Sequence, residues 1–139
     1  MIKYISDAEK TLTKLKKKKI KQIKKTKFNF STADIAPILR GLLSEKNDNK
    51  FILNFKKNSK LDYFINGKDI NRYSNEGTAT PDHVIRVKPF PLVISPKANC
   101  TLHEFKNLAE KKFKEYRQKY KKYFEANKKK TKEKKVMLD

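Results

Sequence analysis

The first part of the chain places apolar residues at the spacing of a helix. Between residues 1 and about 25, the apolar positions are Ile5, Ala8, Leu12, Leu15, Ile20 and Ile23. Steps of three and four put such residues on one stripe, which predicts a single amphipathic helix. The lysine run at 16–19 falls mostly off this stripe. We interpret it as a solvated face, and a contact with nucleic acid or anionic lipid is the alternative.

The central part of the chain changes to shorter elements. Asp34 can cap a helix that carries apolar residues on one face and ends near Ser44. Alternation over 51–55 predicts a strand, and the apolar runs within 83–94 predict two more. A short helix is expected between them, ending at Asn66, with a loop over 68–82. The expected fold class is therefore α/β (α+β), in which helices cover a small sheet of short strands.

The last third of the chain predicts one long basic helix. Thr101 and Glu104 have the spacing of a capping box. After them, aromatic residues recur at helical steps, at Phe105, Phe113, Tyr116, Tyr120 and Tyr123 or Phe124. We interpret this stripe as a buried helix face, and base stacking is the alternative.

These patterns divide the chain into four segments. They are a basic amphipathic helix at 1–30, a compact α/β centre at 31–98, a Tyr/Phe-striped helix at 99–127 and a Lys-rich linker at 128–139.

The chain is strongly basic, with 36 Lys and Arg against 15 Asp and Glu in 139 residues, a net charge of +21. Only four of the basic residues are arginine. Readers of nucleic acid usually prefer arginine, whose planar fork binds phosphate and guanine at two points. We therefore attribute the lysine excess to an AT-rich genome, and we expect weak nonspecific binding of polyanions.

Several classes of protein do not fit the composition. The three glycines form no phosphate-binding loop, so no nucleotide cofactor site is expected in this chain. Two histidines and one cysteine, far apart, predict no metal site. A single cysteine fits a reducing compartment, and no apolar run approaches the length of a membrane span. We expect a cytoplasmic protein without membrane contact, because no signal-peptide core is present.

Residues 77–94 hold the candidate chemistry. The polar candidates are Thr80, Asp82, His83, Arg86 and Lys88. On a strand, residues 84, 86 and 88 would share one face. Histidine beside aspartate, with two cations nearby, could bind an anionic sugar or phosphate or serve in acid–base chemistry. The alternative is a structural loop, with His83 bonded internally and Arg86 paired to Asp82.

This segment resembles a motif of the bifunctional class II aldolase/short-chain dehydrogenase family, of the rhamnulose-1-phosphate aldolase/alcohol dehydrogenase type. The matching residues are Gly77, Thr80, Pro81, Asp82, His83, Val84, Ile85, Arg86 and Lys88. Val87 departs from the family, which usually has threonine there. Residues 35–41 and 116–124 resemble family stretches in the same order, and residues 1–10 resemble the end of the last aldolase helix.

The resemblance implies a central segment of a sugar-metabolising lyase. The family has a zinc-binding aldolase part before this segment and an NAD-binding dehydrogenase part after it. We therefore expect a truncated or split product that is inactive alone, with separate aldolase and dehydrogenase parts as partners and a sugar phosphate as substrate. The five candidates would contact or support the substrate, and no complete catalytic site is expected. The alternative function is a small basic protein that binds RNA or another polyanion.

Overall fold

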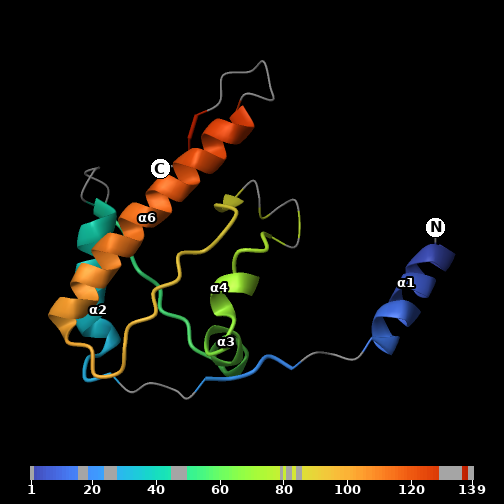
Figure 1. Ribbon diagram of the computed structural model, residues 1–139, viewed down its shortest axis with the longest axis horizontal. Coiled ribbons are helices and arrows are strands. Elements are labelled where there is room, and N and C mark those ends of the chain that lie inside the picture. Colours follow the sequence, from blue (N-terminus) through green and yellow to red (C-terminus); the bar gives the residue numbers. More distant parts are fainter. Residues whose placement is uncertain are drawn as a thin grey trace.

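The described part of the protein is built from helices and extended segments (Figure 1). The computed structural model describes residues 2–15, 19–23, 28–44, 50–78, 80, 83, 86–128 and 136–137. Its helices are α1 (Ile2–Lys14), α2 (Thr32–Ser44), α3 (Ser59–Ile65), α4 (Ile70–Tyr73) and α6 (Leu102–Lys128). Among them, none combines the length and apolar content that crossing a bilayer requires.

The expected sheet of 51–55 and 83–94 is wrong, and so is the α/β fold class. Within the described ranges, the only ladder contact is one antiparallel bridge between Gln22 and Gly67. Residues 51–55 are extended but have no partner strand, and Ile52 is 97% exposed. In the second segment, Pro89 and Pro91 lack the N–H groups that a ladder needs. Alternation therefore produced extended backbone here, without the pairing that makes a sheet.

The N-terminal helix is shorter than the apolar pattern predicted. α1 ends at Lys14, and residues 19–23 are extended. The Ile23 amide donates to the Asn66 carbonyl at 2.8 Å, and the Lys68 amide donates to the Lys21 carbonyl at 2.8 Å. This pairing with the end of α3 takes the place of another helical turn. α1 stands apart from the other helices in Figure 1, with its apolar stripe exposed.

The core lies where α2 packs on α6, and the two helices run side by side in Figure 1. Its buried members are Leu42, Cys100, Phe105 and Ala109. Ala109 has no exposed surface, so α2 approaches α6 closely at a residue that has only a methyl group. The Arg117 side chain donates from Nη2 to the Leu42 carbonyl at 3.0 Å, which satisfies a carbonyl near the end of α2.

The start of α6 confirms the predicted capping box. The Thr101 amide donates to Glu104 Oε2 at 2.7 Å, and the Glu104 amide donates to Thr101 Oγ1 at 3.2 Å. α2 begins differently from the prediction, because Asp34 lies inside the first turn. Its carboxylate accepts from the Ser31 amide at 2.7 Å. Both helices therefore begin at a residue whose amide is held by a carboxylate three positions later.

Leu42→Ala should destabilise the protein by about 2–4 kcal/mol, because it opens a cavity between α2 and α6. Leu12→Ala is the matched control. Leu12 is 65% exposed, so the same truncation should change the free energy of unfolding by less than about 0.5 kcal/mol. Urea unfolding of both variants measures the difference, and equal losses would contradict the placement of the core.

Glu104→Gln should make the stability of the protein less dependent on pH under acid conditions. The amide and hydroxyl of Thr101 lower the pKa of Glu104 below its ordinary value of 4.5. A carboxyl with a lowered folded-state pKa stabilises the fold above its unfolded-state pKa. That contribution is lost as the pH falls through the folded-state value. Urea unfolding at about pH 7 and about pH 3.5 should therefore show a smaller acid loss for the variant than for the native chain.

Candidate functional site

Two of the predicted site residues, His83 and Arg86, lie in a helical turn and not on a strand. Residues 83 and 86 are helical, and the Val87 amide donates to the His83 carbonyl at 2.9 Å. Thr80 Oγ1 lies 2.6 Å from His83 Nδ1, and both side chains are exposed. Arg86 is therefore not on a strand, and residue 84, which was expected to share a strand face with residues 86 and 88, lies outside the described residues. Asp82 lies outside the described residues, and with it the alternative pairing to Arg86.

Two of the five predicted residues, Arg86 and Lys88, meet at one cavity. It is an open concavity of about 550 Å³ between the loop after α4, the segment 86–91 and α6. Its lining consists of Gly77, Thr78, Arg86, Val87, Lys88, Pro89, Phe90, Pro91 and Tyr116. Thr80 and His83 are not among the lining residues. Arg86 and Lys88 therefore line the same concavity, whereas the bonded pair of Thr80 and His83 lies outside its lining.

Phe90 and Tyr116 form the aromatic wall of this concavity. Their ring centroids lie 5.5 Å apart with an interplanar angle of 82°, an edge-to-face contact. The Tyr116 hydroxyl donates to the Phe90 carbonyl at 2.7 Å. Burial raises the pKa of Tyr116, and the nearby Tyr120 adds to the rise. The phenol is therefore protonated at neutral pH and keeps its hydrogen for this bond.

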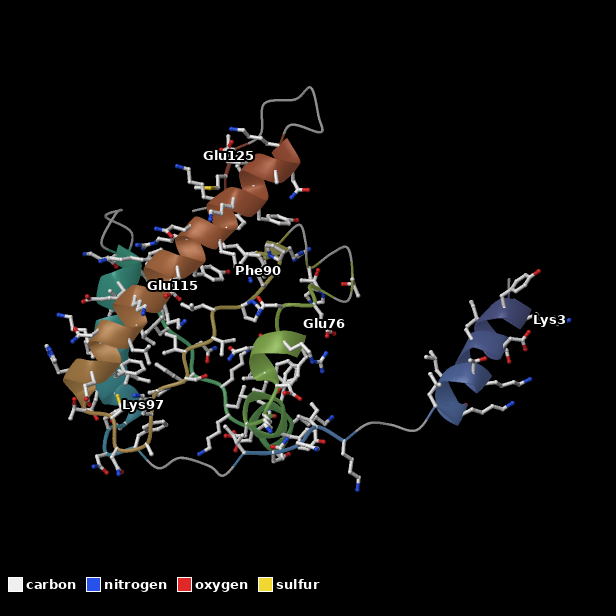
Figure 2. The ribbon with its side chains drawn as sticks, in the orientation of Figure 1. Lys3, Glu76, Phe90, Lys97, Glu115 and Glu125 are labelled. Atoms are coloured by element: carbon white, nitrogen blue, oxygen red, sulfur yellow. The ribbon has the colours of Figure 1, made fainter. Side chains whose placement is uncertain are left out.

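Two lysines, Lys119 and Lys88, contact aromatic rings at or beside this wall. Lys119 Nζ lies 4.0 Å from the centroid of the Phe90 ring and donates to Asn75 Oδ1 in the loop after α4. Lys88 Nζ lies 4.9 Å from the centroid of the Tyr120 ring. An ammonium over an aromatic face is attracted by the ring quadrupole. Figure 2 shows Phe90 beside α6, with Glu76 just beyond α4.

Sequence reasoning missed Phe90, Tyr116 and Lys119 as parts of the site. Tyr116 was placed on the aromatic stripe, and the stripe was interpreted as a buried face. That interpretation is confirmed for Phe105 and Tyr120, which are buried. The stripe extends past the core, however, so its later residues cover the segment 86–91. The proline–aromatic–proline run at 89–91 was the signal that an aromatic wall could form there.

The described residues do not fit a metal centre. Among them, no three histidine, cysteine, aspartate or glutamate side chains come together closely enough to hold an ion. His83 bonds to Thr80, and Cys100 is buried in the core. The zinc that the resemblance implies for the full-length family therefore has no ligand set among these residues.

The arrangement is suited to binding an anion. Arg86 offers a guanidinium and Lys88 an ammonium to one concavity, whose other walls are aromatic, proline and short polar side chains. The Arg86 side chain makes no hydrogen bond or ion pair with another described residue. A general acid and base facing each other across the concavity are not found among its described lining residues.

Comparison with known proteins gives one family and one curated relative. The family described as "Aldolase class II, second domain" matches residues 30–139. A protein of Bacillus subtilis (strain 168), described as "Uncharacterized oxidoreductase YuxG", is 30% identical over 97 residues. The match covers 68% of this chain and 14% of that protein, so the chain spans about a seventh of its relative. No solved structure matches the chain.

Tyr116→Phe should destabilise the protein by about 1 kcal/mol, because it leaves the Phe90 carbonyl without its donor. Tyr123→Phe is the matched control, since Tyr123 is 41% exposed and its hydroxyl bonds to no described residue. It should change the free energy of unfolding by less than about 0.5 kcal/mol. The carbonyl carbon shift of Phe90 should also change in Tyr116→Phe alone, because this carbonyl accepts the bond. Equal effects of the two variants would contradict the assigned bond.

Proposed function

This chain belongs to the class II aldolase family through its second domain, and we propose that it acts as the central segment of a larger sugar-metabolising enzyme. That enzyme would be of the class II aldolase/short-chain dehydrogenase type, with a phosphorylated ketose such as rhamnulose 1-phosphate as substrate. The observation that carries the proposal is the family match over residues 30–139, which spans α2, α6 and the whole concavity.

Two further observations support the proposal. The Bacillus subtilis relative is described as an oxidoreductase, which agrees with a dehydrogenase part beside the aldolase part. This chain matches 14% of that relative, which leaves most of its length for other domains. In the enzyme we propose, the aldolase part would use zinc and the dehydrogenase part NAD. Neither group is assigned to residues of this chain.

The role of this chain would be to contact and support the substrate. Arg86 and Lys88 reach the concavity and would contact the anionic substrate. Thr80 and His83, bonded to each other, would hold the turn that presents Arg86. Asp82, which lies outside the described residues, would be a further supporting residue. On this proposal, the isolated chain has no aldol-cleaving activity, because the reacting carbons meet no catalytic group that it supplies.

A second function is favoured by the charge alone. With a net charge of +21 and many exposed lysines, the chain could bind RNA or another polyanion. Such binding weakens with salt, with a logarithmic slope of about −0.9 for each phosphate neutralised. Binding driven by charge does not require the concavity, whereas the first proposal places the substrate there.

The first experiment identifies the native protein in its source cells. An antibody against residues 77–94 is used for a denaturing immunoblot and for a native pull-down with mass spectrometry. We expect either a species several times heavier than 16.4 kDa or a 16.4 kDa chain together with aldolase and dehydrogenase chains. The pulled-down material should cleave rhamnulose 1-phosphate, and the purified chain supplied with zinc should not.

Two results would contradict this proposal. One is a lone species of 16.4 kDa without either partner chain. The other is aldol cleavage by the purified chain above a metal-free blank. Fluorescence anisotropy with an oligouridylate tests the second function. Binding at physiological salt that weakens steeply as salt is added supports the second function. Affinity that survives at high salt, or that is absent at physiological salt, counts against it.

A further inference from the structure

The N-terminal helix carries an apolar stripe that stays exposed. Ile5, Ala8, Leu12 and Leu15 follow one another at steps of three and four, so they lie on one side of α1. We call these four residues the α1 stripe. The Leu15 amide donates to the Leu12 carbonyl at 3.3 Å, which keeps Leu15 on this side just past the end of the helix. Ile5 is 61% exposed, Leu12 65% and Leu15 60%, so the stripe is open to a partner.

The other side of α1 and the residues after it are cationic. Lys3, Lys10 and Lys14 are exposed and lie away from the α1 stripe, at steps of seven and four. Two further exposed lysines, Lys19 and Lys21, follow the helix. In the sequence, residues 1–23 contain eight lysines and two acids. An apolar surface is thus followed along the chain by strong positive charge, which favours a partner with both apolar and anionic groups.

α1 is too short to depend on its own hydrogen bonds alone. It has 13 residues, a length at which an isolated helix is only marginally stable in water. The helix stands apart from α2 and α6 in Figure 1. In proteins, most of the stability of a short helix comes from packing of its apolar face. A surface that covers the α1 stripe would therefore stabilise the helix as well as bind it.

Charge argues against a second copy of this chain as that surface. Each chain has a net charge of +21, so two copies repel each other. The α1 stripe has only four positions, and one of them is alanine. Pairing two such stripes buries little area compared with the roughly 1,200 Å² at which stable interfaces begin. The partner should therefore be anionic and not another copy.

An anionic bilayer fits the distribution of charge better than a groove in an acidic protein. A groove that holds one helix meets the charge of that helix, and α1 itself contains three lysines and two acids. Most of the positive charge lies on other elements, and on α6 the exposed lysines include Lys111, Lys114, Lys121 and Lys122. An extended anionic surface can meet charge on several elements, and it accepts a shallow stripe without a preformed groove.

We propose that α1 is an interfacial helix, which inserts the α1 stripe shallowly into the surface of an anionic phospholipid bilayer while Lys19 and Lys21 contact the headgroups. Shallow insertion and charge are each weak anchors, and together they give stable attachment. The sequence-based expectation of no membrane contact rested on the lack of a membrane span and of a signal-peptide core, and an interfacial helix needs neither. This inference does not depend on the proposed function.

Cosedimentation with vesicles tests the proposal on the full chain. The vesicles consist of phosphatidylcholine with about 30% phosphatidylglycerol, or of phosphatidylcholine alone, in about 150 mM salt. We expect the chain to bind the anionic vesicles about tenfold more tightly than the neutral vesicles, because lysines contribute to attachment only where the surface is anionic. Added salt should weaken the binding.

Two double variants separate insertion from general charge, since a chain with a net charge of +21 is attracted to any anionic surface. Leu12→Gln with Leu15→Gln removes both leucines of the α1 stripe and should weaken binding to the anionic vesicles about tenfold or more. Ile52→Gln with Val136→Gln is the matched control, because these apolar residues lie outside α1 and are 97% and 84% exposed. It should change the affinity by less than about twofold, because it leaves the α1 stripe intact.

Tryptophan fluorescence shows which side of α1 enters the bilayer, because the chain contains no tryptophan of its own. Leu12→Trp places the probe on the α1 stripe. Thr13→Trp places it one residue later, turned by about 100° around the helix axis and away from the stripe. We expect a blue shift and quenching by brominated lipid in Leu12→Trp, and much smaller changes in Thr13→Trp. Both variants keep every lysine, so their charge is the same.

Several results would overturn the proposal. They are equal binding by the native chain and the double leucine variant, equal fluorescence changes in the two tryptophan variants, and no binding to the anionic vesicles at this salt. A native chain that is dimeric by sedimentation equilibrium, with a monomeric double leucine variant, would identify a second copy as the partner instead. Loss of the aldolase and dehydrogenase chains from a pull-down of the double leucine variant, without vesicle binding by the native chain, would identify a protein partner and leave the proposed function intact.

Discussion

The packing of α2 against α6 is the interaction on which the rest of the described centre depends. Leu42 reaches a surface of α6 where Ala109 leaves room for it, and Phe105 and Cys100 close the space around them. Many apolar residues elsewhere are exposed, and Ile52 is 97% exposed. This contact fixes the position of α6. The side chains of its second half can then hold segments that are neither helical nor paired with a strand among the described residues.

The candidate site is the clearest case of such organisation. The segment 86–91 has no strand partner and two prolines, so its own backbone cannot hold it. Tyr116 bonds to its carbonyl at Phe90, and Lys119 covers the Phe90 ring while bonding to Asn75. One helix thus fixes two loops through side chains one turn apart. The concavity between those loops is a product of this arrangement.

Local patterns predicted α2, α3 and α6, because each of these helices depends on nearby residues. The prediction was wrong for α4, which lies within the expected loop at 68–82, and it extended α1 beyond its end at Lys14. The capping box at Thr101 and the apolar spacing of α2 are visible within a few positions. The strand expected at 51–55 was wrong because a strand needs a partner, and residues 51–55 pair with none among the described residues. The strand expected to begin near residue 83 was wrong for a related reason, since apolar runs favour a strand only when a neighbouring strand supplies the ladder.

Only part of the candidate site could be predicted, because some of its residues meet through tertiary contacts and not through local sequence. Arg86 and Lys88 could be chosen by their chemistry, and both reach the concavity. Phe90 and Tyr116 could not be matched in advance, because they lie 26 residues apart and meet only through the placement of α6.

The bond from Arg117 to the Leu42 carbonyl closes a loop of 75 residues, and this has a consequence for folding kinetics. Closing such a loop costs chain entropy before any tertiary contact repays it, so we expect the docking of α6 to be a late step. The two loops that line the concavity have no stable position until that step is complete. On warming, local opening should begin with these loops, and the contact between α2 and α6 should persist longest. A ligand that bridges the loops would therefore slow the first stage of unfolding while leaving the helical contact unchanged.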